Sequence, residues 1–184
     1  MRAWVISIVL MVTACANEPV ATPREYLDDS TASTITIVAN PWVLTRTGAP
    51  PQLDLVHLYA VDVNQTGHHG CYLAVIQYWP AATATHGEQA QLVLNIADTQ
   101  KRLQPVTDRP GQLGIGAPLD MAAPASAKTW FYPLDTQTLT ALAGASTLSV
   151  ELVASGASAN YESWRDGSAE LKAFAEAIQS RRSQ

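Results

Sequence analysis

The sequence lacks an apolar run long enough to cross a membrane. A spanning helix needs about 20 apolar residues, whereas the longest apolar stretch covers only residues 3–12 and is interrupted by Ser7. No later segment of the 184-residue chain approaches that length. We therefore expect the body of the protein not to be a membrane-spanning one.

Positive charge and cysteine are both scarce. The chain has 11 Lys and Arg against 16 Asp and Glu, which gives a formal net charge of −5 at pH 7. Because nucleic-acid binding depends on dense positive charge, no nucleic-acid partner is expected. The two cysteines are Cys15 and Cys71. A chain of this length can fold without a metal or a disulfide, and Cys71 is expected to pack as a small apolar side chain.

Familiar catalytic signatures are also missing. The sequence contains no G-x-S-x-G element and no H-E-x-x-H helix. The glycines between Gly111 and Gly116 follow neither the dinucleotide nor the P-loop spacing, and no lysine follows them. These absences favour a protein that is not an enzyme and uses no cofactor.

The N-terminus carries the most specific pattern in the chain. Arg2 is followed by the apolar core and then by Val12-Thr13-Ala14-Cys15. A charged start, a short apolar core and small residues at the cut site are typical of a secretory signal. Small residues directly before a cysteine resemble the lipobox of bacterial lipoprotein precursors. A plain secretory signal cut near Ala14 or Ala16 is the alternative.

The resemblance implies that residues 1–14 are removed and that Cys15 becomes a lipidated N-terminus, bearing a diacylglycerol and an acylated amine. Several acyl chains together give stable membrane anchoring. Ala16 follows the cysteine, where an aspartate would look like an inner-membrane retention signal. The resemblance thus favours a lipid-anchored protein of the bacterial outer membrane that faces the periplasm. It covers only about the first 20 residues.

Composition and periodicity divide the rest of the chain into a tether and one domain. Residues 15–33 are rich in Pro, Asp, Ser, Thr and Ala and predict a lipid anchor with a flexible tether. Residues 34–184 predict a single β-rich α+β domain, with an antiparallel sheet or a two-layer β-sandwich and two helices in its C-terminal half. No motif in this domain carries a family resemblance.

Alternating patterns place the elements of that domain. Strands are expected at 34–38, 42–46, 89–96, 101–106, 128–132 and 148–154, and residues 53–63 and 71–79 should form a long central hairpin. Helices are expected over 136–143 and about 168–181, the first capped by Asp135. Residues 107–127, rich in Gly, Pro and Ala, predict a functional or disordered loop.

One group of side chains has the chemistry of a metal site. His68, His69 and Cys71 are adjacent in the sequence, and imidazoles with a thiolate suit zinc or copper. Adjacent histidines point in different directions, however, and no second cluster supplies further ligands. A polar hairpin tip followed by a packed cysteine explains the pattern without a metal. A small-molecule or metal-binding module at this tip stays as the second hypothesis.

The leading hypothesis is a non-enzymatic envelope lipoprotein whose domain binds or supports another envelope component. Tyr72, Tyr78 and Trp130 are candidates for an aromatic surface that contacts an envelope protein or a glycan, and core packing is the alternative. A third hypothesis is a periplasmic hydrolase with an unfamiliar site around His57 or the 107–127 loop. His57 lies on the apolar face of its predicted strand.

Overall fold

The computed structural model describes residues 20–48, 54–78, 90–120, 122–124, 126–154 and 157–182. The predicted signal segment 1–14 and the predicted lipidation site Cys15 lie outside the described residues. The described strands are β1 (Arg24–Asp28), β2 (Ser33–Ile37), β3 (Trp42–Arg46), β4 (Leu55–Gln65), β5 (His68–Tyr78), β6 (Gln91–Ile96), β7 (Thr99–Leu103), β8 (Lys128–Pro133), β9 (Leu148–Ala154) and β10 (Ala157–Arg165). The helices are α1 (Thr136–Ala143), α2 (Ser168–Arg182) and a short 3₁₀ helix (Pro110–Leu113).

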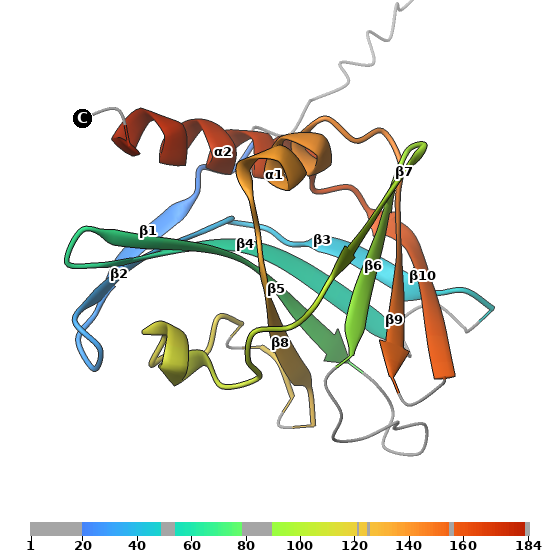
Figure 1. The fold of residues 1–184 in the computed structure, drawn as a ribbon, viewed down its shortest axis with the longest axis horizontal. Helices are drawn as coiled ribbons and strands as arrows, with labels where there is room; N and C mark the ends of the chain where they lie inside the picture. Colours follow the sequence, from blue (N-terminus) through green and yellow to red (C-terminus); the bar gives the residue numbers. More distant parts are fainter. Residues whose placement is uncertain are drawn as a thin grey trace, which may run out of the picture.

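All the strands belong to one antiparallel sheet, which is strongly curved (Figure 1). The long strand β4 lies at its centre and pairs with β5 along one edge. Its other edge is shared by β2 and β3, which lie one after the other along β4. From β3 the sheet continues through β10, β9 and β6 to β7. The prediction of a β-rich α+β fold with two C-terminal helices is confirmed, with an open sheet in place of a sandwich.

The two faces of the central strands are covered by different parts of the chain. The inner face carries Leu58, Val75 and Trp130 and packs in one apolar core with α1 and α2. The outer face carries the alternate residues, including His57 and Ile76, and is crossed by the connection between β7 and β8. No helix among the described residues is long and apolar enough to span a membrane.

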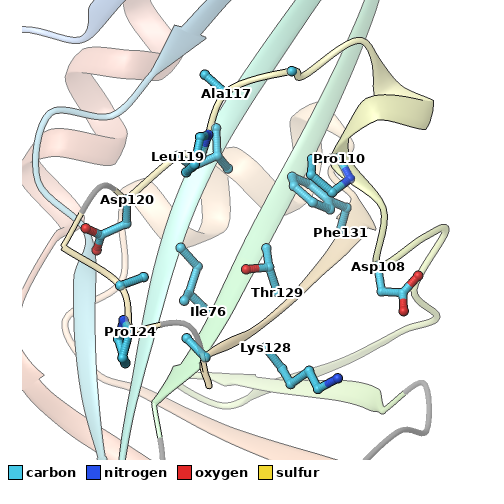
Figure 2. Close-up of a pocket in the computed structure, with 14 residues that line it drawn as sticks. Ile76, Asp108, Pro110, Ala117, Leu119, Asp120, Pro124, Lys128, Thr129 and Phe131 are labelled. Atoms are coloured by element: carbon cyan, nitrogen blue, oxygen red, sulfur yellow. The ribbon is translucent and has the colours of Figure 1, made fainter.

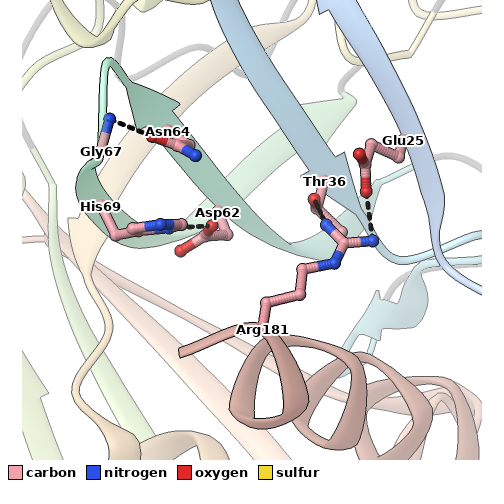
Figure 3. A network of polar contacts seen from close by, with 7 residues as sticks. All are labelled: Glu25, Thr36, Asp62, Asn64, Gly67, His69 and Arg181. Atoms are coloured by element: carbon pink, nitrogen blue, oxygen red, sulfur yellow. Dashed lines mark hydrogen bonds and ion pairs between the residues drawn. The ribbon is translucent and has the colours of Figure 1, made fainter. Parts of the chain in front are cut away.

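The central hairpin forms as predicted, but its turn is shorter. β4 and β5 stay paired as far as Gln65 and His68, so only Thr66 and Gly67 remain in the turn. Both have positive φ, 51° and 90°, as a type I′ turn requires. Glycine adopts this conformation without strain, and Asn64 Oδ1 accepts a hydrogen bond from the Gly67 N–H at 2.8 Å (Figure 3).

Two strands were not predicted. β1 lies inside the segment assigned to the flexible tether, where it pairs with β2 through Tyr26 and Leu27. The prediction that the tether extends to residue 33 is therefore wrong. β10 was missed because its sequence is mostly polar and its residues are largely exposed, except for the fully buried Tyr161. β10 is held by backbone pairing with β3 and β9, which its composition does not indicate.

Both α-helices form where the capping and periodicity of the sequence predict them. Asp135 Oδ1 accepts a hydrogen bond from the Thr138 N–H at 2.6 Å, which caps α1, and Gly144 follows its last turn. In α2 the apolar stripe of Leu171, Phe174 and Ile178 is buried against the sheet and α1. Both helices therefore help to fill the inner face.

Candidate functional site

The connection between β7 and β8, residues 104–127, forms a loop over the outer face that is fixed at three places. The first is the end of β1. Asp28 Oδ2 accepts hydrogen bonds from the N–H groups of Gly116 and Ala117, at 2.5 and 3.1 Å. Hydrogen bonds from the Ser30 hydroxyl and the Gly116 N–H are the main causes that lower the Asp28 pKa to about 2. The ionised carboxylate therefore holds this part of the loop.

The second fixed place is a cluster of side chains around Asp120. The phenols of Tyr59 and Tyr78 both donate to Asp120 Oδ2, at 2.9 and 2.6 Å. Asp120 Oδ1 accepts a hydrogen bond from the Ala122 N–H at 2.9 Å. β4 and β5 each supply one tyrosine, so a single loop carboxylate bridges the two central strands.

His57 completes this cluster. Its Nδ1 is buried, lies 3.5 Å from Asp120 Oδ2, and has no hydrogen-bond partner among the described residues. Its ring packs against the Tyr78 ring with the centroids 4.5 Å apart. Desolvation by burial is the main cause that lowers the pKa of His57, and it outweighs the opposing effect of the Asp120 charge. At neutral pH the imidazole is therefore uncharged.

The acid–base properties of the cluster suit a fixed contact better than proton transfer. Burial, followed by the hydrogen bond to Asp120, raises the pKa values of Tyr59 and Tyr78, so both phenols stay protonated. Burial alone would raise the pKa of Asp120, but the hydrogen bonds from Tyr78, Ala122 and Tyr59 lower it overall. Asp120 thus stays ionised and accepts the two phenolic hydrogen bonds.

The third fixed place is the start of the loop. The Val106 N–H donates to the Phe131 carbonyl at 2.8 Å, and the Phe131 N–H donates to the Thr107 carbonyl at 2.9 Å. The chain that leaves β7 therefore pairs briefly with β8. This short pairing holds the start of the loop against β8, which otherwise pairs only with β5 among the described strands.

A pocket of about 400 Å³ lies between this loop and strands β5 and β8 (Figure 2). Its walls are mainly apolar, with Ile76 and Phe131 on the sheet side and Leu119 and Pro124 on the loop side. The Thr129 side chain lies among them and makes no hydrogen bond within the described part of the chain. A concave, largely apolar pocket with few polar groups is typical of a small-molecule site.

Charged side chains lie at the margin of the pocket rather than inside it. Asp108 and Lys128 both line it, but their charged ends point away from its centre in Figure 2. Asp120 is held by its tyrosine partners. The pocket therefore combines apolar side chains with polar groups, among them the Thr129 hydroxyl, which fits an uncharged ligand that has both apolar and polar parts.

The structure does not gather His68, His69 and Cys71 into one site. His68 and His69 are neighbours on β5 and point to opposite faces, and His69 Nδ1 contacts Asp62 Oδ2 at 2.8 Å (Figure 3). Cys71 is partly buried beside a cavity of about 20 Å³ that is also lined by Ile178 of α2. No group of three or more His, Cys, Asp or Glu in the described ranges is arranged to hold a metal.

The aromatic candidates also lie on different faces. Trp130 is 7% exposed and belongs to the inner core. Tyr72 and Tyr78 lie on the outer face and are partly buried, and Tyr78 is held by Asp120. The three therefore do not form one aromatic surface.

Sequence reasoning did not single out Asp28 or Asp120 as the residues that hold the loop. Each lies in a segment without clear periodicity, and each makes its contacts far away in the sequence, Asp28 with the loop and Asp120 with β4 and β5. The composition of residues 107–127 marked the loop itself as unusual. No protein-family model, curated protein or solved structure matches the chain.

Proposed function

We propose that the protein is a lipid-anchored, non-enzymatic binding protein of the bacterial envelope, and that its ligand site is the pocket beneath loop 104–127. The observation that carries the binding role is the pocket itself, because its loop wall is fixed at three places. A site that is organised in advance loses little conformational entropy when it binds.

The Asp120 cluster supports binding over hydrolysis. His57 beside Asp120 is the arrangement that favours a hydrolase, because an imidazole next to a carboxylate can act as a general base. Here the same carboxylate oxygen already accepts hydrogen bonds from Tyr59 and Tyr78. We therefore assign the cluster to holding the loop wall of the pocket.

The anchor is supported by the lipobox-like segment Val12-Thr13-Ala14-Cys15. We propose that acylated Cys15 holds the domain at the envelope, and Ala16 favours the outer membrane facing the periplasm. Intact-mass analysis of protein purified from its native host tests this. We expect a chain that begins at Cys15 and carries acyl groups. A chain that begins at Met1, or one that is cut but carries no acyl group, would contradict the anchor.

Fluorine NMR with 5-fluoroindole tests the pocket, because this probe is small, uncharged and soluble in water. The matched variants are Thr129→Trp, which fills the pocket from the sheet, and Thr99→Trp, which adds the same side chain to an exposed site on β7. We expect the probe signal to broaden with the wild type and with Thr99→Trp, and not to broaden with Thr129→Trp. Equal broadening with all three proteins would show that the probe does not enter the pocket.

A further inference from the structure

The lipid anchor proposed above leaves the domain little room to move away from the bilayer. Only residues 16–23 separate Cys15 from the first residue of β1. Eight residues span at most about 30 Å even when fully extended. The surface around the start of β1 must therefore lie close to the lipid headgroups whenever Cys15 is acylated.

The start of β1 and the end of β10 lie at the same corner of the sheet. Arg24 pairs with Ile37 at the end of β2, and Arg165 pairs with Val43 in β3. β2 and β3 follow one another along β4 and are joined by residues 38–41. Asn40 in this link contacts Glu170 at the start of α2 at 3.4 Å.

Two arginines at this corner carry positive charge without a partner among the described residues. Register places both Arg24 and Arg165 on the outer face, on either side of Tyr59, and both are exposed. Both act electrostatically on Tyr59, where they oppose the rise in its pKa. Neither forms a hydrogen bond or an ion pair in the part of the chain that the structure describes.

Nearby acidic groups do not neutralise these arginines directly. Asp166 accepts hydrogen bonds from the N–H and hydroxyl of Ser168, at 2.8 and 3.1 Å. Glu25 pairs with Arg181 of α2, which also donates to Thr36 Oγ1 at 2.7 Å (Figure 3). The guanidinium groups of Arg24 and Arg165 therefore remain available to an anion from outside the domain.

Trp164 adds an exposed aromatic ring beside Arg165. The pairing of β10 with β3 shifts register between Ser163 and Arg165, so Trp164 lies at a β-bulge or similar irregularity of the strand. A bulge redirects a side chain away from the regular alternation. Trp164 is 52% exposed, whereas Trp42 and Trp130 are buried in the core. Tryptophan is enriched where proteins meet membrane headgroups, because its ring is apolar and its N–H is polar.

We propose that Arg24, Trp164 and Arg165 form the surface through which the domain rests on the bilayer that holds its anchor. The arginines contact headgroup phosphates, and Trp164 inserts at the level of the headgroups. This inference rests on the lipid anchor proposed above and adds the orientation of the domain. We assign lipid as the partner of this surface because the chain between Cys15 and β1 is short.

Tryptophan quenching by brominated lipids tests the contact. Acylated protein from the native host is reconstituted into vesicles of phosphatidylethanolamine and brominated phosphatidylglycerol. Trp164→Phe should remove most of the lipid-dependent quenching, and Trp130→Phe, which changes a core residue, should retain it. Quenching that is unchanged in Trp164→Phe would overturn the proposed surface.

A comparison of charge variants tests the two arginines together, apart from Trp164. The double variant Arg24→Gln/Arg165→Gln should lower the quenching in the phosphatidylglycerol vesicles, whereas Arg102→Gln/Arg109→Gln, with two exposed arginines elsewhere, should not. Equal quenching in both double variants would overturn the headgroup contact. A vesicle flotation assay distinguishes failure of the surface from failure of the anchor. Protein that does not float with the vesicles contradicts lipidation. Protein that floats, but whose quenching is the same in the variants as in the wild type, contradicts only the proposed surface.

Discussion

At the scale of single residues, Asp120 is the contact on which the loop depends most. Its carboxylate accepts hydrogen bonds from Tyr59 and Tyr78, and its side chain is only 13% exposed. We expect Asp120→Asn to lower the free energy of unfolding by about 1–3 kcal/mol, because the buried Tyr59 and the partly buried Tyr78 lose a charged acceptor. Urea unfolding measures this change. Asp108→Asn, an exposed change in the same loop, is the control and should have little effect.

His57 gives the domain a pH dependence of defined sign. Burial lowers its pKa in the folded state below the usual 6.5, so the unfolded chain binds more protons in this range. Its contribution to stability is present above about pH 6.5 and is lost as the pH falls toward the folded pKa. We expect the wild type to lose stability between about pH 7.5 and pH 5, and His57→Gln to lose less. Identical slopes in urea unfolding would contradict this role.

The residues of the candidate site show what a sequence pattern can locate. Alternation placed His57 on an apolar strand face, and the structure half-buries it on the outer face. Nothing in the pattern identified Asp120 as its neighbour, because the two residues are 63 positions apart and the loop has no periodicity. Burial can be inferred from a local pattern, whereas the partner of a buried polar group depends on the fold.

At the scale of elements, Gly114 determines how the loop lies against the sheet. Its φ is +79°, and a Cβ there would lie 2.1 Å from Gln65 Nε2 and 2.6 Å from Ser33 Oγ. The Gly114 carbonyl also accepts a hydrogen bond from Thr31 Oγ1 at 2.7 Å. We expect Gly114→Ala to lower the free energy of unfolding by about 1–3 kcal/mol, since it adds both backbone strain and a clash.

Hydrogen exchange measures this effect within the loop. The amides of Gly116 and Ala117, which donate to Asp28, should exchange faster in Gly114→Ala. Gly111→Ala is the matched control, because a Cβ at Gly111 meets nothing within 4 Å. Equal protection of the two amides in both variants would show that Gly114 does not control the position of the loop.

Strands with strong alternation could be predicted, and those without it could not. β4, β5 and β6 have apolar patterns that fix their position and pairing face. β1 and β10 are mostly polar or exposed and are held by backbone pairing with their neighbours. Backbone hydrogen bonds are available to almost any sequence, so these two strands leave little trace in composition.

At the scale of the whole molecule, we propose that acylation of Cys15 and the length of chain between it and β1 set where the domain works. The sequence predicted a tether as far as residue 33, but β1 already belongs to the sheet. The connection to Cys15 is therefore shorter by about a strand and a turn. A shorter connection brings the domain closer to the bilayer, which is why the exposed Trp164 and its neighbouring arginines gain importance.

Three carboxylates join distant parts of the fold and make the whole molecule sensitive to acid. Asp28 fixes the loop to β1, Asp120 fixes it to β4 and β5, and Asp135 caps α1 and contacts Lys101 of β7 at 2.6 Å. Hydrogen bonds lower the pKa of Asp28 to about 2, and the bonds from Lys101 and Thr138 lower that of Asp135 to about 2. The pKa of Asp120 is lowered as well.

The sign of this acid dependence follows from linkage. A carboxyl group with a lowered folded pKa stabilises the protein above its unfolded pKa, near 3.8, and this contribution is lost as the pH falls through about 2. We therefore expect the melting temperature to fall steeply between about pH 4 and pH 2, and less steeply in Asp28→Asn and in Asp135→Asn. Asp98→Asn, an exposed change in the β6–β7 turn, should follow the wild type. If the two carboxylate variants also follow the wild type, these hydrogen bonds do not favour the ionised carboxylates in the folded state.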